Sequence, residues 1–305
     1  MKKNNMYNLA PILLFVYKRL DTLQYTVESL KANLLAKNSE LYIYSDAYKS
    51  ETDKKGVEDV RQFIKSIQGF KSVHIVESID NKGLAKSIIY AVSEIINQYG
   101  KVIVLEDDLL LSSNFLTFMN KSLDFYENNP KVYSISGFMF DIDLKKHYSY
   151  DVFFTKRHCS WGWAMWKDRW NRIDWEVKDF QEFMDNFSMQ KKFNDIGADL
   201  TYSLKRQQKG EINSWAIRCN YQQFKEQTYT VYPLKSKVDN LGFGDDATHT
   251  KQRFNKYKAT LDRELKYEYS FPDDVFEEPI LINKFKRKYS KLTRFYYYVL
   301  NKLFM

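Results

Sequence analysis

The first half of the chain alternates short β-rich runs with amphipathic helical runs, and this pattern constrains the fold most strongly. Buried-type apolar or β-branched runs predict strands at residues 9–17, 41–45, 73–76, 101–105 and 132–136. Between them, apolar residues recur at helical spacing, as in Leu23, Val27, Leu30 and Leu34. Strands alternating with helices predict the α/β class, with a mainly parallel sheet flanked by helices.

The pattern changes near residue 151 to aromatic-rich irregular segments and polar helices, ending in an expected strand at 229–232 and a glycine-rich loop at 242–250. No repeat, low-complexity tract or flexible linker marks a boundary. We therefore expect one catalytic domain at 1–255, with a first half at 1–140 and a second half at 150–255. Residues 256–305 form a C-terminal extension.

The basic charge is concentrated at the end of the chain. The net charge is +8, and residues 281–305 contain no acidic residue but seven basic ones, Lys284, Lys286, Arg287, Lys288, Lys291, Arg294 and Lys302. The rest of the chain is nearly neutral, which argues against a broad nucleic-acid surface.

The cysteines and the apolar runs indicate the compartment. Cys159 and Cys219 are far apart and form no metal-ligand or disulfide pattern, which favours a reducing environment. The run at 9–17 follows Lys2 and Lys3 like a weak signal peptide, but Pro11 interrupts it, and we interpret it as a strand. No apolar run approaches the roughly 20 residues that cross a bilayer. We expect a cytoplasmic protein.

Three adjacent carboxylates, Glu106, Asp107 and Asp108, follow the strand at 101–105 and form what we call the acid triplet. Three like charges repel one another, and a divalent cation stabilises them naturally. Mn²⁺ or Mg²⁺ takes oxygen ligands from one or two carboxylates and completes its shell with phosphates and water. The alternative is a cluster of turn and helix-capping acids, although Ser112 or Ser113 can cap the next helix without them.

Polar residues also follow the other strands, where ligands bind in open α/β sheets. Arg19 follows the first strand and Asp46 the second, while Asn81 and Gly83 follow the third. Gly83 stands before a helix, whose N-terminal N–H groups favour negative charge. Arg19 as a surface charge and Asp46 as a turn acid are the competing interpretations.

The acid triplet with Leu109 and the run 113–116 resembles the metal-binding motif of the N-acetylglucosaminyltransferase I type of glycosyltransferase. The resemblance extends over about residues 9–250, and it implies the GT-A fold, a Rossmann-like nucleotide-diphospho-sugar transferase fold. It also implies that Asp108 ligates Mn²⁺ or Mg²⁺ on the donor diphosphate, and that Glu106 and Asp107 face the ribose and sugar. Asp46 would accept from a uracil N–H, which favours a UDP-sugar donor.

Second-half segments resemble parts of bacterial members of the same family. The run 158–164 resembles a Gly-Trp segment that lines the sugar cleft, and Trp161 is its first candidate, against core packing as the alternative. The loop ending in His249 resembles one that closes over the donor. At 211–218, Asn213 and Ser214 stand where an acid is expected, so Glu211 is the candidate base. An acid at a helix N-terminus is the competing interpretation of Glu211.

The tail at 281–305 interleaves basic and aromatic residues, the composition of an interfacial membrane segment. We expect peripheral attachment to the inner face of the cell membrane, where a lipid-linked glycan acceptor is presented. The alternative is a terminal helix docked on the body or on another protomer.

Together these features predict a metal-dependent glycosyltransferase that transfers a sugar with inversion to a glycan hydroxyl, in surface polysaccharide biosynthesis. A nucleotidyltransferase is an alternative, but it would want a glycine-rich phosphate loop after the first strand, and residues 17–21 contain no glycine. The other alternative is an inactive sugar-nucleotide or glycan-binding module, because no acid stands at 213 or 214.

Overall fold

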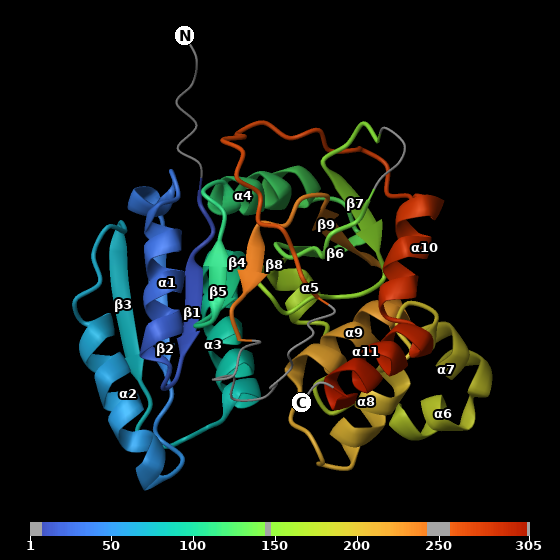
Figure 1. Cartoon of the computed structure of the whole chain (residues 1–305), viewed down its shortest axis with the longest axis horizontal. Coiled ribbons are helices and arrows are strands. Elements are labelled where there is room, and N and C mark those ends of the chain that lie inside the picture. Colours follow the sequence, from blue (N-terminus) through green and yellow to red (C-terminus); the bar gives the residue numbers. More distant parts are fainter. Residues whose placement is uncertain (1–7, 144–147, 243–256, 304–305) are drawn as a thin grey trace.

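The computed structural model describes residues 8–143, 148–242 and 257–303, and its centre is an eight-stranded sheet with helices on both faces (Figure 1). The first half contains β1 (Ile12–Val16), α1 (Leu20–Lys31), the 3₁₀ helix η1 (Ala36–Asn38), β2 (Glu40–Ser45), α2 (Glu51–Ile64), β3 (Ser72–Glu77), α3 (Leu84–Tyr99), β4 (Lys101–Glu106), β5 (Leu109–Leu111), α4 (Phe115–Tyr126) and β6 (Val132–Ser136).

The second half contains β7 (Val152–Thr155), β8 (Trp163–Trp166), α5 (Lys167–Trp170), α6 (Phe180–Asp185), α7 (Phe187–Asn194), α8 (Leu200–Gln208), α9 (Trp215–Glu226), β9 (Tyr229–Pro233) and β10 (Val238–Asn240). The extension contains α10 (Pro279–Lys288) and α11 (Lys291–Leu303). None of the helices within the described ranges is long and apolar enough to cross a bilayer.

The first-half strands are parallel, in the order β3-β2-β1-β4, with Ile12 of β1 opposite Leu41 of β2 and Ile103 of β4. The uninterrupted apolar run of β1 is explained by burial on both faces. Ile12 and Leu14 pack in the cluster that includes α1, α2 and α4, while Leu13 and Phe15 pack in the cluster that includes α3. All five β1 residues are buried as a result.

The expectation of a mainly parallel sheet is not confirmed, because the second half of the sheet is mixed. β8 lies between β4 and β6 and is antiparallel to both, and β7 is antiparallel to β9. β8 had been part of an expected irregular segment. All four of its residues are buried, so it lacks the alternation of polar and apolar residues that marks a half-buried strand.

The cap expected for α4 differs from the observed one. The residue before α4 is Asn114, and neither Ser112 nor Ser113 occupies that cap position. The Ser112 hydroxyl instead donates to Asn114 Oδ1 at 2.8 Å.

The described part of the extension, from residue 257, is packed against the rest of the protein, and the division at residue 255 stays a prediction. Lys237 and Asp262 form a buried ion pair, and Tyr126 donates to the carbonyl of Pro272 at 3.1 Å. Leu281 and Phe285 of α10 belong to the same apolar cluster as Ile12 of β1. The described parts on either side of the expected boundary therefore share one core.

His158 is a buried neutral base under the second half of the sheet. Its Nδ1 lies 3.0 Å from the Ser134 hydroxyl of β6, and its ring packs edge-on against Trp163 and Trp215. Burial lowers the pKa of His158 to about 3.

We expect His158→Gln to weaken the dependence of stability on acid pH. In the unfolded chain His158 is protonated below about pH 6.5, whereas in the folded chain it is protonated only below about pH 3. The free energy of unfolding therefore decreases as the pH falls below 6.5. The loss amounts to about 1.4 kcal/mol per pH unit within that window. Urea unfolding at pH 7 and pH 5 should show the free-energy gap between wild type and variant shrinking at pH 5, and a constant gap would contradict a neutral His158.

Candidate active site

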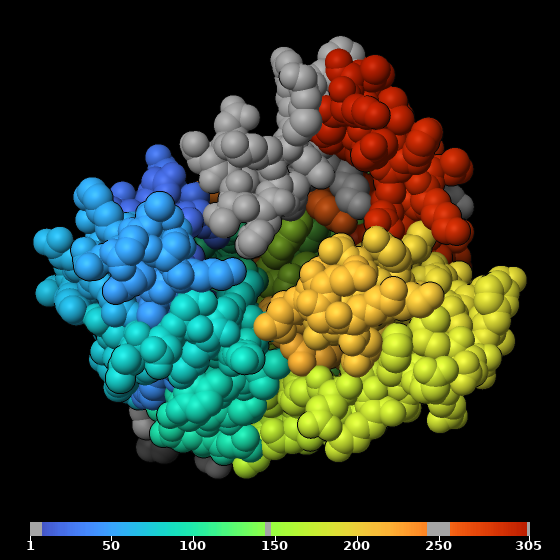
Figure 2. Space-filling model, turned by 90° about the horizontal axis from the view of Figure 1, so that it is seen from below, coloured from blue at the N-terminus to red at the C-terminus, as the bar shows by residue number. Residues whose placement is uncertain are grey.

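The carboxyl ends of the parallel strands border one cavity of about 570 Å³. Figure 2 shows this face of the molecule, hollowed between the blue and teal first half and the gold segment of the second half. Eight residues expected from the sequence line this cavity, namely Arg19, Asp46, Asn81, Gly83, Glu106, Asp107, Asp108 and Trp161. Glu211 is not among the lining residues, and His249 lies outside the described residues.

The acid triplet sits where β4 ends, and Arg19 is the cation that contacts it. Arg19 pairs with both Asp107 and Asp108, with Nη2 3.0 Å from Asp108 Oδ2. The backbone N–H of Tyr17 donates to Asp107 Oδ2 at 3.2 Å. Asp108 Oδ1 is buried and has no hydrogen-bond partner among the described residues. One acceptor of the triplet is therefore unsatisfied within the described residues.

Desolvation makes ionisation of Glu106 and Asp107 less favourable. Burial raises the pKa of Glu106 to about 8, and the charges of Asp108 and Asp107 raise it as well. Burial also raises the pKa of Asp107 to about 6, although the Arg19 guanidinium opposes that rise. Arg19 therefore offsets only part of the cost of charging Glu106 and Asp107.

A divalent cation fits this donor set. No group of three or more His, Cys, Asp and Glu side chains within the described ranges is arranged to hold a metal ion by itself. The site offers oxygen ligands only, with Asp108 Oδ1 free of other bonds. Mg²⁺ and Mn²⁺ suit such a site, because they bind through one or two carboxylates and complete their shell with substrate phosphates and water.

The backbone of the second half closes against Asp108. β10 pairs antiparallel with β5, placing Asn240 opposite Leu109, and Leu241 N–H donates to the Asp108 carbonyl at 2.8 Å. A Cβ atom at Gly242 would collide with the Asp108 carboxylate. Asn240 and Gly242 also line the cavity. They begin the glycine-rich segment that resembles a donor-closing loop in its sequence, but they were not named as site residues, because their contact with Asp108 depends on a pairing between distant segments.

Asp46 and Asn81 connect two of the loops that form the cavity wall. The Asp46 carboxylate accepts from the N–H groups of Lys82 at 2.9 Å and Gly83 at 2.8 Å, and Asn81 Nδ2 donates to the Ala47 carbonyl at 2.6 Å. Asp46 therefore connects the end of β2 to the loop that precedes α3. Recognition of a uracil by Asp46 stays a prediction.

The N-terminus of α3 faces the cavity. Gly83 precedes the helix with a φ of 73°, and no side chain caps the first turn. The Ser87 hydroxyl is buried and has no hydrogen-bond partner among the described residues. Gly83, Leu84 and Ser87 line the cavity. Free helix N–H groups and a free hydroxyl favour an anionic group here.

Tyr17, Lys18, Lys49 and Asp53 also line the cavity and were not proposed as site residues. Lys18 pairs with Asp53. The Tyr17 hydroxyl donates to Asp53 at 3.0 Å and accepts from the Lys49 N–H at 2.9 Å. The signal for Tyr17 and Lys18 was their place directly after β1; Lys49 and Asp53 carried no motif.

Trp161 differs from the other tryptophans of its segment. Trp163, Trp166 and Trp170 are buried at 1–2% exposure and belong to the core. Trp161 is half-buried, packs edge-on against Phe138 at 4.6 Å between ring centres, and lines the cavity. Its position is fixed by Gly162, whose φ is 59° and whose carbonyl accepts from the Gly137 N–H at 2.6 Å.

Glu211 lies in the turn between α8 and α9. Its carboxylate pairs with Arg206 at 3.1 Å, and 47% of its side chain is exposed. The cap of α9 is Ser214, whose hydroxyl accepts from Ile217 N–H at 3.3 Å. The structure does not bring Glu211 together with the acid triplet.

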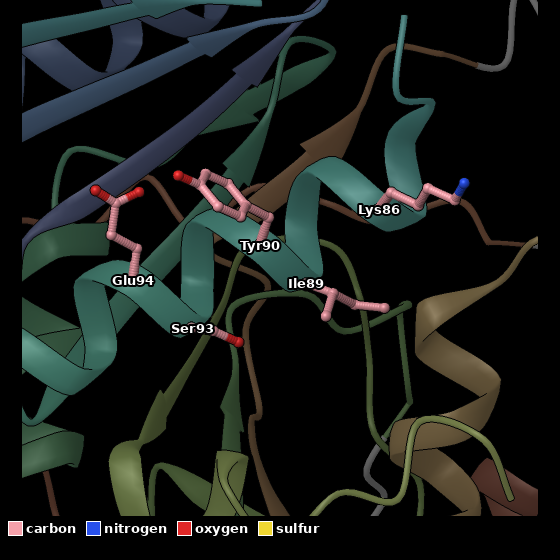
Figure 3. A pocket seen from close by; sticks show the side chains of 5 residues that line it. All are labelled: Lys86, Ile89, Tyr90, Ser93 and Glu94. Atoms are coloured by element: carbon pink, nitrogen blue, oxygen red, sulfur yellow. The ribbon is translucent and has the colours of Figure 1, made fainter.

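A second hollow of about 650 Å³ lies along α3 and is lined by Lys86, Ile89, Tyr90, Ser93 and Glu94 (Figure 3). It is larger than the cavity at the strand ends but contains one carboxylate and none of the acid triplet. We therefore take the cavity at the strand ends as the candidate active site.

No protein-family model matches the sequence, and no curated protein matches it. The similar solved structures include glycosyltransferases. The mannosyltransferase PcManGT from Pyrobaculum calidifontis, in complex with GDP-Man and Mn²⁺, is 14% identical over 44% of this chain and 39% of its own, with a TM-score of 0.30. S. aureus TarS is 8% identical over 76% of this chain and 60% of its own, with a TM-score of 0.41.

An active-site mutant of LgtC is 12% identical, with 72% of both chains covered and a TM-score of 0.36. The chain thus spans less than two thirds of PcManGT and of TarS. Similarity at this level assigns no family, and the functional argument has to rest on the cavity itself.

We expect Asp46→Ala to destabilise the protein by about 1–3 kcal/mol, because it leaves the N–H groups of Lys82 and Gly83 without their acceptor. Asp59→Ala is the matched control, since the contact that Asp59 makes within the described residues is an exposed ion pair with Lys55 on α2. The control should change stability by less than about 1 kcal/mol. Equal losses in the two variants, measured by urea unfolding, would contradict the connecting role of Asp46.

Proposed function

We propose that the chain is a metal-dependent glycosyltransferase of the GT-A type, which transfers a sugar from a nucleotide-sugar, in our view a UDP-sugar, to a hydroxyl of a glycan acceptor. One observation carries the proposal: the acid triplet, in which Asp107 and Asp108 are buried, lies in one cavity with polar residues from three other strand ends, and one Asp108 oxygen has no hydrogen-bond partner among the described residues. That combination suits a ligand with a diphosphate, a cation and several hydroxyl groups.

The cavity offers a complementary group for each part of such a donor. Arg19 and the N-terminus of α3 supply positive potential for the diphosphate. Glu106 and Asp107 are acceptors for ribose and sugar hydroxyls. Trp161 presents an apolar ring to a sugar face.

In this proposal Asp108 would hold Mn²⁺ or Mg²⁺ with its carboxylate. The bound ion would neutralise the charge that develops on the departing nucleoside diphosphate. Arg19 already neutralises part of the Asp107 and Asp108 charge, so it reduces the repulsion between these carboxylates when the donor is absent. Gly242 leaves the space in which the Asp108 carboxylate sits.

We further propose single displacement with inversion, in which a carboxylate takes the acceptor proton, and Glu211 is the base to test. A base acts only within about 2.6–3.2 Å of the proton donor. Glu211 would have to leave Arg206 and reach an acceptor bound beside the cavity. The setting we propose is surface polysaccharide biosynthesis, with a lipid-linked glycan as one form of the acceptor.

The second candidate function is a sugar-nucleotide or glycan-binding module without turnover. The observation that favours it is the position of Glu211 outside the lining residues, together with Asn213 and Ser214 in place of an acid. Donor binding without turnover would support this candidate.

The test is a panel of nucleotide sugars with Mn²⁺, read by thermal stabilisation and by release of nucleoside diphosphate. We expect one donor to stabilise the protein and to turn over. Asp108→Asn should lower turnover by at least about a hundredfold, because one unsatisfied amide cannot replace the charged ligand. Asp59→Asn, on the surface of α2, should leave turnover unchanged. A protein that responds to no nucleotide sugar would contradict the proposal.

For Glu211 we expect the Glu211→Gln variant to bind the donor normally, with kcat lowered about 10²–10⁴-fold, the range over which a positioned base contributes. Arg206→Gln is the control, since it removes the partner of Glu211 and leaves the carboxylate. If kcat of Glu211→Gln stays within a few-fold of wild type, another group takes the proton.

A further inference from the structure

Helix α11 carries an apolar stripe that faces away from the protein. Leu292, Phe295, Tyr296 and Leu303 are 82%, 66%, 59% and 71% exposed. These residues and the half-exposed Val299 follow the i, i+3, i+4, i+7, i+11 spacing that places side chains on one face of a helix. We call these five residues the outer stripe. A helix of a globular protein normally turns such a stripe toward the core, whereas here the stripe is left exposed.

The preceding helix, α10, behaves differently, which separates two parts of the basic tail. Leu281, Ile282 and Phe285 are buried, and Phe285 packs edge-on against Tyr232 at 5.2 Å between ring centres. Lys286 pairs with Asp195, and Lys288 lies over the Phe140 ring at 5.3 Å. α10 therefore connects α11 to the body of the protein (Figure 1). The side chains of the outer stripe stay exposed.

The charge of α11 indicates the chemistry of its partner. The helix contains Lys291, Arg294 and Lys302 and no acidic residue. Lys291 and Lys302 are both exposed and eleven residues apart, so they lie on the same side of the helix, beside the outer stripe. Exposed cations flanking apolar and aromatic side chains match the headgroup and acyl layers of an anionic bilayer.

A second copy of the chain fits this surface less well. A symmetric contact would bring the same patch of both copies together and would place their basic residues against one another. Like charges in a shared interface repel, whereas anionic headgroups attract all of them. A helix of 13 residues is too short to span a bilayer but long enough to lie in its surface.

We propose that α11 binds the surface of an anionic lipid bilayer, lying in its plane with the outer stripe inserted below the headgroups and Lys291 and Lys302 at the phosphate level. The outer stripe and the cavity share no residues. The proposal is therefore tested independently of the donor and of turnover, and it would hold for a binding module as well as for an enzyme.

The experiment is flotation of the full chain with vesicles of phosphatidylcholine alone or of equimolar phosphatidylcholine and phosphatidylglycerol. We expect binding to the anionic vesicles only. Phe295→Ser should lower the partition constant about tenfold, because it removes one inserted aromatic side chain. Lys291→Gln and Lys302→Gln should lower it about fivefold each. Phe187→Ser is the control, since Phe187 is 79% exposed on α7 and outside the stripe.

Sedimentation velocity without lipid, with thermal unfolding to verify that each variant is folded, completes the test. Anionic-vesicle binding that is lost in Phe295→Ser but kept in Phe187→Ser supports the proposal. The proposal is overturned if wild type does not float with anionic vesicles, or if Phe295→Ser floats as well as wild type. It is also overturned if wild type self-associates through the stripe and does not bind lipid, which would make a second copy the partner.

Discussion

The ion pairs of Arg19 with Asp107 and Asp108 connect the ends of the two neighbouring strands on which the cavity is built. β1 and β4 are buried on both faces, so their pairing positions Arg19 and the acid triplet with little freedom. Three carboxylates at the end of a buried strand are costly, because burial and mutual repulsion both disfavour their charge. Arg19 offsets part of that cost, and Asp108 Oδ1 has no hydrogen-bond partner in the described part of the chain. This imbalance is the physical reason to expect a cation in the cavity.

Most of the first half could be predicted from the sequence, because local patterns determine it. An uninterrupted apolar run such as Ile12–Val16 predicts a strand in the centre of a sheet. In a parallel sheet the polar residues that follow the strands then lie together at the carboxyl edge. This is why Arg19, Asp46, Asn81 and the acid triplet, which are far apart in the chain, meet in one cavity. The hydrogen bonds that Asp46 accepts from the backbone of Lys82 and Gly83 could not be predicted, because every residue except proline has a backbone N–H group and the sequence does not show which of them meets Asp46.

The second half depends on contacts between distant segments, and sequence patterns fail there. β8 is buried on both faces and aromatic, so it does not show the alternation of a strand. The pairing of β10 with β5 brings Gly242 to Asp108 across more than a hundred residues. The tail illustrates the same limit, since α10 and α11 have similar basic-aromatic sequences but only α10 is packed into the core. The tail was expected to be either a membrane segment or a docked helix. The docked helix describes α10 but not the exposed stripe of α11.

The central claim is that the cavity at the strand ends holds a divalent cation together with a nucleoside diphosphate, and a crystal structure of the protein with Mn²⁺ and UDP tests it most directly. Mn²⁺ can be located by its anomalous scattering. The account predicts an ion bonded to an Asp108 carboxylate oxygen and to the diphosphate, with the diphosphate near Arg19 and the N-terminus of α3. A nucleotide bound elsewhere, or an ion that does not contact Asp108, would contradict it.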